Sequence, residues 1–169
     1  LGVPAAQSAQ ALGTFQNVKR RMELRARVQL PAAPQGQPVS VYDDFAHHPS
    51  AIRTTLDGLR RRLGPQARIV AVFEPRSNTM KLGAMKAQLP WSLEEADIAF
   101  CHSGGLGWDA RAALAEMGAR ARVCDTVEAL AQQVAAQSQP GDHIVCMSNG
   151  GFGGIHARLI ALLGEAPAV

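Results

Sequence analysis

Short apolar runs alternate along the chain with longer segments whose apolar residues recur at helical spacing, from about residue 25 onward. The short runs predict strands at residues 22–30, 39–44, 67–73, 95–102, 121–125 and 142–148. The longer segments predict helices at residues 48–64, 79–88, 107–118, 127–137 and 155–164. Strands separated by helices of ten or more residues are typical of a parallel sheet with helices on both faces.

Two of these strands differ in pattern, and the first long helix has an unusual end. Residues 22–30 alternate polar and apolar, which favours a strand at a sheet edge. Residues 67–73 are almost continuously apolar, as expected of a strand covered on both faces. Three arginines (60–62) fall in the last turn of the helix at 48–64, where cations meet the negative end of the helix dipole. We expect them to have a structural role rather than to bind phosphate.

Four loops follow predicted strands and lead into predicted helices. Ligands of parallel α/β sheets bind beyond the carboxyl ends of the strands, in loops of this kind. The loops hold nearly every unusual polar residue of the chain, and read "DDFAHHPS" (43–50), "EPRSNT" (74–79), "HSGGLGW" (102–108) and "SNGGFGG" (148–154). The sequence therefore predicts a binding site at this edge of the sheet.

The loop "DDFAHHPS" allows three interpretations. Asp44 ends a strand, and a carboxylate at that place is suited to accept hydrogen bonds from a ribose hydroxyl pair. Pro49 suits the first turn of a helix, which favours simple capping and packing. The third interpretation is metal binding or acid–base chemistry, but a metal site needs three or four converging ligands and DDxxHH matches no recognised set. His47 and His48 can each be hydrogen-bonded neighbours without a further role.

The other loops are also ambiguous. In "EPRSNT", Arg76 offers a planar donor fork for a carboxylate or phosphate, but Asn78 or Thr79 can instead cap a helix while Arg76 is solvated. No Lys-Ser/Thr follows "SNGGFGG", so it is not a P-loop. Its glycines either let backbone N–H groups approach an anion or form a tight strand-to-helix turn. We interpret "HSGGLGW" as a flexible turn.

The composition narrows the class of protein. Of 169 residues 47% are hydrophobic and 18% charged, which fits one compact domain with a substantial core. The net charge of +3 comes without the aromatic and basic pattern of nucleic-acid binding, and no apolar run is long enough to span a membrane. The three cysteines have no CxxC spacing, so we expect buried reduced thiols in a cytoplasmic protein. The chain does not begin with Met, which suggests a fragment of a longer protein.

Four motifs together resemble the C-terminal domain of the Mur ligases: "NVKRRME", "VYDDFAHHPSAI", "AVFEPRSNTMKLG" and "SNGGFGGIH". The resemblance covers the chain from about Phe15 onward. The alanine-adding branch of that family typically shows "DDYGHHPT" and "FQPHRYTR" in the second and third motifs. The stretch "FEPRSNTMK" is instead similar to the branch that attaches a recycled peptide. The implied fold is an α/β, Rossmann-like three-layer domain with a mostly parallel sheet and one antiparallel edge strand.

The resemblance also implies a reaction and its partners. Mur ligases use ATP and Mg²⁺ to phosphorylate a UDP-muramoyl carboxylate, and an amine then attacks the acyl phosphate. In the peptide-adding branch the carboxylate belongs to UDP-N-acetylmuramate. The amine belongs to the murein tripeptide L-Ala-γ-D-Glu-meso-diaminopimelate of peptidoglycan recycling. The implied class is therefore an ATP-dependent peptide ligase of the cytoplasm, with no nucleic-acid or membrane partner.

Individual roles follow by motif. Arg21 and Asp44 are implied to contact ATP, Asp44 through the ribose, and His47 to face the substrate. The loop at residues 76–78 replaces the one that recognises the amino acid in the alanine-adding branch, so it is expected to recognise the tripeptide. The expected substrate-contacting residues are His47, Arg76, Ser77, Asn78, Ser148 and Asn149; no metal ligand and no catalytic residue is expected.

The chain departs from the family in what it lacks. It has no GxxxxGKS/T, and phosphoryl transfer depends on the positioned lysine of such a loop. We therefore expect residues 1–18 to be the tail of the central domain and the hinge, packed poorly when severed, and residues 19–169 to be the C-terminal domain. The UDP-sugar domain and the central ATPase domain would be its partners elsewhere in the parent chain. The fragment alone is expected to be inactive and to bind no cofactor tightly.

Three alternatives stay open. The first is the same domain of a UDP-N-acetylmuramate–L-alanine ligase. The second is a free-standing α/β module that binds a small molecule. The third is a metal hydrolase that uses Asp43, Asp44, His47 and His48.

Overall fold

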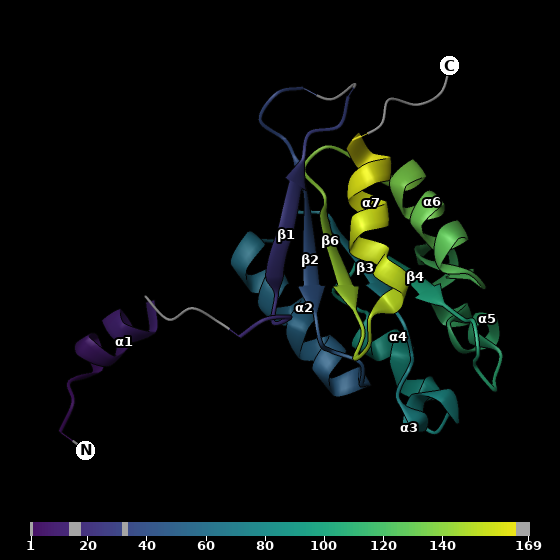
Figure 1. Cartoon of the computed structure of the whole chain (residues 1–169). Coiled ribbons are helices and arrows are strands. Elements are labelled where there is room, and N and C mark those ends of the chain that lie inside the picture. The colour runs from purple at the N-terminus through teal and green to yellow at the C-terminus, as the bar shows by residue number, and fades with distance from the viewer. Residues whose placement is uncertain (1, 14–17, 32–33, 165–169) are drawn as a thin grey trace.

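The computed structural model describes residues 2–13, 18–31 and 34–164, and within them a six-stranded sheet carries helices on both faces (Figure 1). The strand order is β1-β2-β6-β3-β4-β5; β1 runs antiparallel to β2, and the other neighbours are parallel. This confirms the predicted sheet with one antiparallel edge strand. The strands are β1 (Glu23–Val28), β2 (Val39–Asp44), β3 (Ile69–Phe73), β4 (Ile98–His102), β5 (Ala121–Cys124) and β6 (His143–Met147).

The helices form two layers. Figure 1 shows α6 and α7 side by side on one face of the sheet, with α2 and α4 on the other. The α-helices are α1 (Ala5–Gly13), α2 (Pro49–Leu63), α3 (Asn78–Lys81), α4 (Leu89–Ser92), α5 (Ala110–Ala113), α6 (Val127–Gln137) and α7 (Ile155–Gly164). Short 3₁₀ helices are η1 (Lys86–Gln88), η2 (Ala115–Arg120) and η3 (Phe152–Gly154).

Each face of the sheet has its own hydrophobic core. On one side Leu56 of α2 and Leu89 of α4 pack in a cluster with Phe73. On the other side Leu130 of α6 and Leu159 of α7 belong to a second cluster. Every residue of β2 and β3 is buried because both of their faces are covered. Burial on both faces leaves the carboxyl ends of these strands as the places where their polar groups can meet a ligand.

The continuous helix predicted at 79–88 is wrong. The structure has the single turn α3, a bend at Gly83, and then η1 and α4. Gly83 has a φ of 76°, in the left-handed region that favours glycine, and a Cβ there would lie 2.9 Å from the Trp108 ring. The bend therefore depends on a close approach that the helical pattern of the sequence does not reveal.

The helix predicted at 107–118 is also shorter than expected. Asp109 caps the start of α5 by accepting hydrogen bonds from the N–H groups of Arg111 and Ala112. The α-helix then ends at Ala113 and continues as η2, in which Gly118 has a φ of 54°. The apolar spacing is kept, but the segment is tightened into 3₁₀ geometry.

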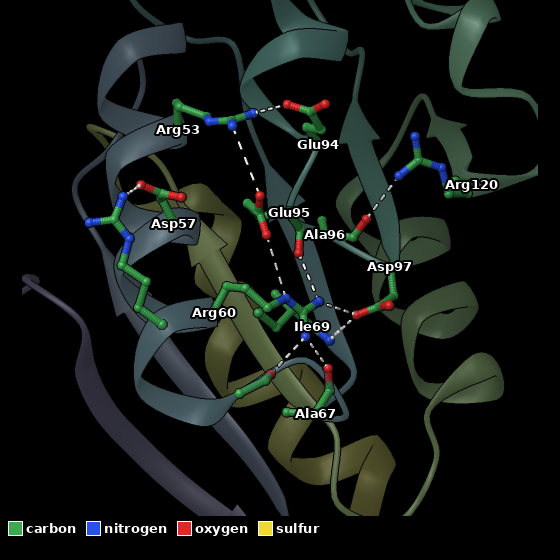
Figure 2. Close-up of polar contacts among 12 residues, drawn as sticks. Arg53, Asp57, Arg60, Ala67, Ile69, Glu94, Glu95, Ala96, Asp97 and Arg120 are labelled. Carbon is green, nitrogen blue, oxygen red and sulfur yellow. Dashed lines mark hydrogen bonds and ion pairs between the residues drawn. The ribbon is translucent and has the colours of Figure 1, made fainter.

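Arg60 fixes the carboxyl end of α2 to the rest of the domain (Figure 2). Its guanidinium donates to the Glu95 carbonyl at 2.9 Å, to the Asp97 carboxylate at 2.7 Å and to the Ala67 carbonyl. The side chain is only 18% exposed. Arg61 is 79% exposed and pairs with Asp57 one turn earlier. These contacts fit the structural role expected of the arginines at this helix end.

The amino-terminal segment contributes little to the packing. Residues 2–11, which include most of α1, are exposed. The assignment of residues 1–18 to the tail of the central domain and the hinge stays a prediction. No helix within the described part of the chain is long and apolar enough to cross a membrane.

Candidate functional site at the carboxyl edge of the sheet

The loops after β2, β6 and β3 are joined in a row at the carboxyl edge. The Ser148 N–H donates to the Asp44 carbonyl at 3.1 Å, and the Glu74 N–H donates to the Met147 carbonyl at 3.1 Å. The loop after β6 leads to α7 on one face, whereas those after β2 and β3 lead to helices on the other. Loops that diverge in this way mark the place where α/β sheets bind ligands.

Asp44 holds the first loop in place. One carboxylate oxygen accepts the Met22 N–H at 2.8 Å, and the other accepts the Ala46 N–H at 2.8 Å and the Thr55 hydroxyl at 3.2 Å. The residue is 3% exposed. A carboxylate offers about four acceptor positions, so these three donors leave room for about one more. The ribose contact of Asp44 therefore stays a prediction, beside a structural role that the sequence did not indicate.

The two histidines of this loop have separate local partners. His47 Nδ1 lies 2.9 Å from the Phe45 carbonyl oxygen, and its ring meets the Phe45 ring edge-on. His48 occupies the N-cap position of α2, with Nδ1 3.1 Å from the Ser50 hydroxyl, and Pro49 begins the helix as predicted. Among the described residues, no group of three or more His, Cys, Asp or Glu side chains is placed to hold a metal ion.

Arg20, which sequence reasoning missed, connects the end of β2 to the loop after β6. Its guanidinium donates to Asp43 at 3.2 Å and to the carbonyls of Ser148 at 2.6 Å and Gly150 at 2.9 Å. Arg20 has a φ of 60°, a left-handed conformation that costs roughly 1–2 kcal/mol and is here offset by these contacts. Sequence reasoning selected the neighbouring Arg21 instead.

Arg21 and Arg20 share an aromatic contact. Their guanidinium carbons lie 5.4 and 5.2 Å, respectively, from the centre of the Phe45 ring. Cation–π contacts at this range restrict where the two side chains can lie. The predicted contact of Arg21 with ATP is untested, but its guanidinium lies beside the loop that carries Asp44.

Asp43 of β2 and His156 of α7 form a mostly buried pair. His156 Nε2 is 3.5 Å from the Asp43 carboxylate, and Asp43 also receives Arg20. Burial lowers the pKa of His156 below its ordinary value, against the opposing effect of Asp43. The imidazole is therefore held neutral beside a carboxylate that Arg20 already neutralises.

The loops after β3 and β6 meet through Glu74. The Ser148 hydroxyl donates to the Glu74 carboxylate at 2.7 Å and accepts the Gly150 N–H at 3.0 Å. Arg76 lies 3.9 Å from the same carboxylate and is half exposed. The structure thus places Arg76 and Ser148 beside the same carboxylate, which the sequence analysis did not single out, and their contact with substrate stays a prediction.

The remaining predicted residues are placed differently. Ser77 caps α3 by accepting the Met80 N–H at 3.4 Å, so the alternative cap at Asn78 or Thr79 is wrong. Asn78 is the first residue of α3. The amide oxygen of Asn149 is buried and makes no hydrogen bond with the described residues. Within the described residues, neither Ser77 nor Asn78 forms a hydrogen bond with Glu74. Their contact with the substrate stays a prediction.

A surface hollow of about 520 Å³ lies elsewhere, between the segments of η1–α4 and α5–η2. It is lined mainly by small side chains such as Pro90 and Ala113, and none of the predicted site residues lines it. The converging polar groups at the carboxyl edge, rather than this hollow, are the better candidate for a site.

Residues 20–150 match the family described as Mur ligase, glutamate ligase domain. The chain belongs to this family. The match begins at Arg20 and ends at Gly150, two residues that contact each other at the carboxyl edge. The resemblance drawn from the four motifs is confirmed.

Relatives of this Mur ligase domain include ligases that add a peptide and ligases that add alanine. The UDP-N-acetylmuramate–L-alanyl-γ-D-glutamyl-meso-2,6-diaminoheptandioate ligase of Escherichia coli K12 is 47% identical over 161 residues, or 95% of the chain and 34% of that protein. The UDP-N-acetylmuramate–L-alanine ligase of Thermosynechococcus vestitus is 32% identical over 162 residues, or 89% of the chain and 32% of that protein. The chain therefore spans about a third of the length of these relatives.

A solved structure of a ligase shares the fold of this chain. The crystal structure of a murein peptide ligase from Psychrobacter arcticus 273-4 superposes on this Mur ligase domain with a TM-score of 0.76 and 38% identity. The superposition covers 99% of the chain and 35% of that protein. The six-stranded arrangement and its carboxyl edge thus belong to a fold shared with a full-length ligase.

Proposed function

We propose that the chain is the C-terminal, substrate-closing part of an ATP-dependent ligase that joins UDP-N-acetylmuramate to the tripeptide L-Ala-γ-D-Glu-meso-diaminopimelate. The observation that carries the proposal is the loop at residues 74–78, which lies beside the diverging loop after β6 in a chain 47% identical to the E. coli peptide ligase. The alanine-adding relative is less similar, at 32% identity, and serves as the competing candidate.

In this proposal, the loops at the two sides of the carboxyl edge bind different substrates. The loop after β2, with Asp44 and the nearby Arg21, faces ATP. The loops after β3 and β6 face the peptide, and Arg76 is suited to bind one of its carboxylates because a guanidinium donates two parallel hydrogen bonds. Ser148, with its backbone bonded to Asp44 and its hydroxyl to Glu74, connects the two sides.

The chain supplies only part of the chemistry. The described residues offer no three-ligand group suited to a magnesium ion, so we assign magnesium and the phosphate-gripping lysine to the central domain of the full-length ligase. Closure of this domain over the central one would then bring the peptide amine to the acyl phosphate, a positioning role that can supply much of a rate enhancement.

The test is phosphate release from ATP by the full-length ligase that contains this chain. Release should require both UDP-N-acetylmuramate and the tripeptide. Arg76→Ala should raise the KM for the tripeptide by about tenfold or more and leave the KM for ATP unchanged. Arg61→Ala, which removes an exposed arginine far from the edge, is the matched control. Equal effects of both variants on every substrate would refute the proposed role of this loop.

A further inference from the structure

Glu74 lies near the middle of the carboxyl edge, directly after the fully buried strand β3. Its side chain is 13% exposed, so it is mostly withdrawn from water yet still reachable. One carboxylate oxygen, Oε2, accepts the Ser148 hydroxyl at 2.7 Å. This bond fixes the direction in which the other oxygen, Oε1, points.

Glu74 Oε1 lies close to two nitrogens and bonds to neither. His102 Nδ1 is 3.7 Å away and Arg76 Nη1 is 3.9 Å away, both beyond hydrogen-bond range. His102 Nδ1 is buried and has no hydrogen-bond partner among the described residues. A buried polar atom without a partner is uncommon and costs free energy, which is recovered if a ligand supplies the missing bond.

Two glycines make room for the side chains beside Glu74. A Cβ at Gly150 would lie 2.7 Å from Arg76 Nε, and a Cβ at Gly104 would lie 2.8 Å from His102 Nε2. Both distances are shorter than real Cβ atoms allow, so Arg76 and His102 can lie against bare backbone only because these residues are glycines. The loops "HSGGLGW" and "SNGGFGG" are therefore fitted to this cluster.

The unfilled positions match an amine. A primary amine carries several N–H donors, and an amine nitrogen at hydrogen-bond distance from both Glu74 Oε1 and His102 Nδ1 would form the apex of a triangle on their 3.7 Å separation. The carboxylate favours a donor over an anion at this point. Arg76, half exposed and able to turn away, remains available for a carboxylate of the same molecule.

The location favours the reacting amine. Asp44 ends β2 and Glu74 directly follows β3, and only β6 lies between these two strands, a separation of roughly 10 Å at the usual strand spacing. We infer that Glu74, together with His102, accepts hydrogen bonds from the alanyl amine of the incoming peptide, the amine that becomes the new amide. This inference rests on the proposed function and adds to it the residue that holds the nucleophile.

The experiment compares the affinity of two forms of the ligase for two peptides, which together make a double-mutant type of thermodynamic cycle. The full-length ligase and its Glu74→Gln variant are titrated calorimetrically, with UDP-N-acetylmuramate and a non-hydrolysable ATP analogue present. The ligands are the tripeptide and an analogue with propionyl in place of alanyl, which lacks only the amine. Gln keeps the size of Glu74 and an oxygen for Ser148, so the variant removes the charge and replaces the acceptor Oε1 by an amide N–H donor.

The unmodified ligase should bind the tripeptide about tenfold to a hundredfold more tightly than the propionyl analogue, the usual effect of a hydrogen bond to a charged group. In Glu74→Gln this preference should fall to about twofold. Ser148→Ala, which removes the other partner of Glu74, should weaken both peptides alike and keep the preference. If Glu74→Gln also keeps the preference, Glu74 only supports Ser148 and the inference is wrong.

Two further arms separate the possible failures. If Glu74→Gln does not fold, His102→Gln takes its place and should likewise reduce the preference for the amine; an unchanged preference counts against the inference. If the unmodified ligase does not bind the tripeptide but ligates L-alanine, the proposed function fails. The same cycle with L-alanine and propionate then tests Glu74 independently.

Discussion

Removal of the Arg60 guanidinium is the perturbation with the best-defined structural consequence. Arg60→Ala deprives the Glu95 and Ala67 carbonyls of their donor and leaves the Asp97 carboxylate with the Ile69 N–H, at 2.7 Å, as its donor within the described part of the chain. Figure 2 shows these partners converging on the guanidinium. They lie in segments that precede β3 and β4, so Arg60 joins the end of α2 to the start of two strands.

The size of the effect follows from burial. Hydrogen bonds that involve a charged group contribute about 1.5–3 kcal/mol each, and bonds that share one side chain do not add fully. Arg60 is 18% exposed but Asp97 is 44% exposed, so water screens their ion pair and most of the effect comes from the bonds to the two carbonyls. We expect Arg60→Ala to lower the free energy of unfolding by about 3 kcal/mol. For a domain of this size that corresponds to a fall in Tm of roughly 6–12 °C.

The neighbouring arginine provides the control. Arg61→Ala removes the same charge from the same helix, but its side chain is 79% exposed and pairs with Asp57 one turn earlier. We expect a change within about 0.5 kcal/mol. Urea unfolding of the chain, followed by the fluorescence of its two tryptophans and by circular dichroism, gives both values. Equal destabilisation by the two variants would show that the last-turn charge, not the network of Arg60, stabilises the domain.

Three further predictions concern the edge and the core. Arg20→Ala should cost about 1–3 kcal/mol and slow ligation by the full-length enzyme, and Arg20→Lys should restore only part of either; full recovery with Lys would argue against the three-contact geometry. Burial lowers the pKa of both His143 and His156 from their ordinary 6.5, so the unfolded chain binds protons more readily. The stabilisation that comes from the two neutral histidines should therefore be fully present above about pH 6.5 and be lost as the pH falls below it. In thermal melts, a His143→Gln variant should show a smaller fall of Tm with decreasing pH, and an unchanged pH profile would contradict this. The thiols of Cys101 and Cys146 are fully buried with raised pKa values, so a thiol reagent should label neither until the chain unfolds; rapid labelling of the folded chain would contradict the packing.

The order of elements was predictable because local pattern and tertiary environment agree there. The continuously apolar run that becomes β3 is buried at every position, and the helix predicted at 127–137 is found as α6, which Thr126 caps by accepting the Ala129 N–H. The two helices that were predicted too long end early: α3 ends at Lys81, before the bend at Gly83, and α5 ends at Ala113. The bend at Gly83 depends on the close approach of the Trp108 ring, which periodicity does not contain.

The candidate site was only partly predictable for a related reason. Asp44 stands out because it ends an apolar strand, and Glu74 directly follows β3, so similar reasoning would have found it. Arg20 could not be found in this way, because its partner Ser148 is 128 residues away. His102 was assigned to a simple turn, since its relation to Glu74 depends on the pairing of β3 with β4.

The most direct test of the account is a competition reaction with the full-length ligase that contains this chain. Equal concentrations of L-alanine and the tripeptide are offered together with UDP-N-acetylmuramate, ATP and magnesium, and the products are quantified by mass spectrometry. The product ratio equals the ratio of the two kcat/KM values. The account predicts at least about a hundredfold more tripeptide product, because a site built to bind the polar groups of a peptide discriminates strongly against a substrate that lacks them. Alanine product in equal or greater amount would contradict it and assign the domain to the alanine-adding branch.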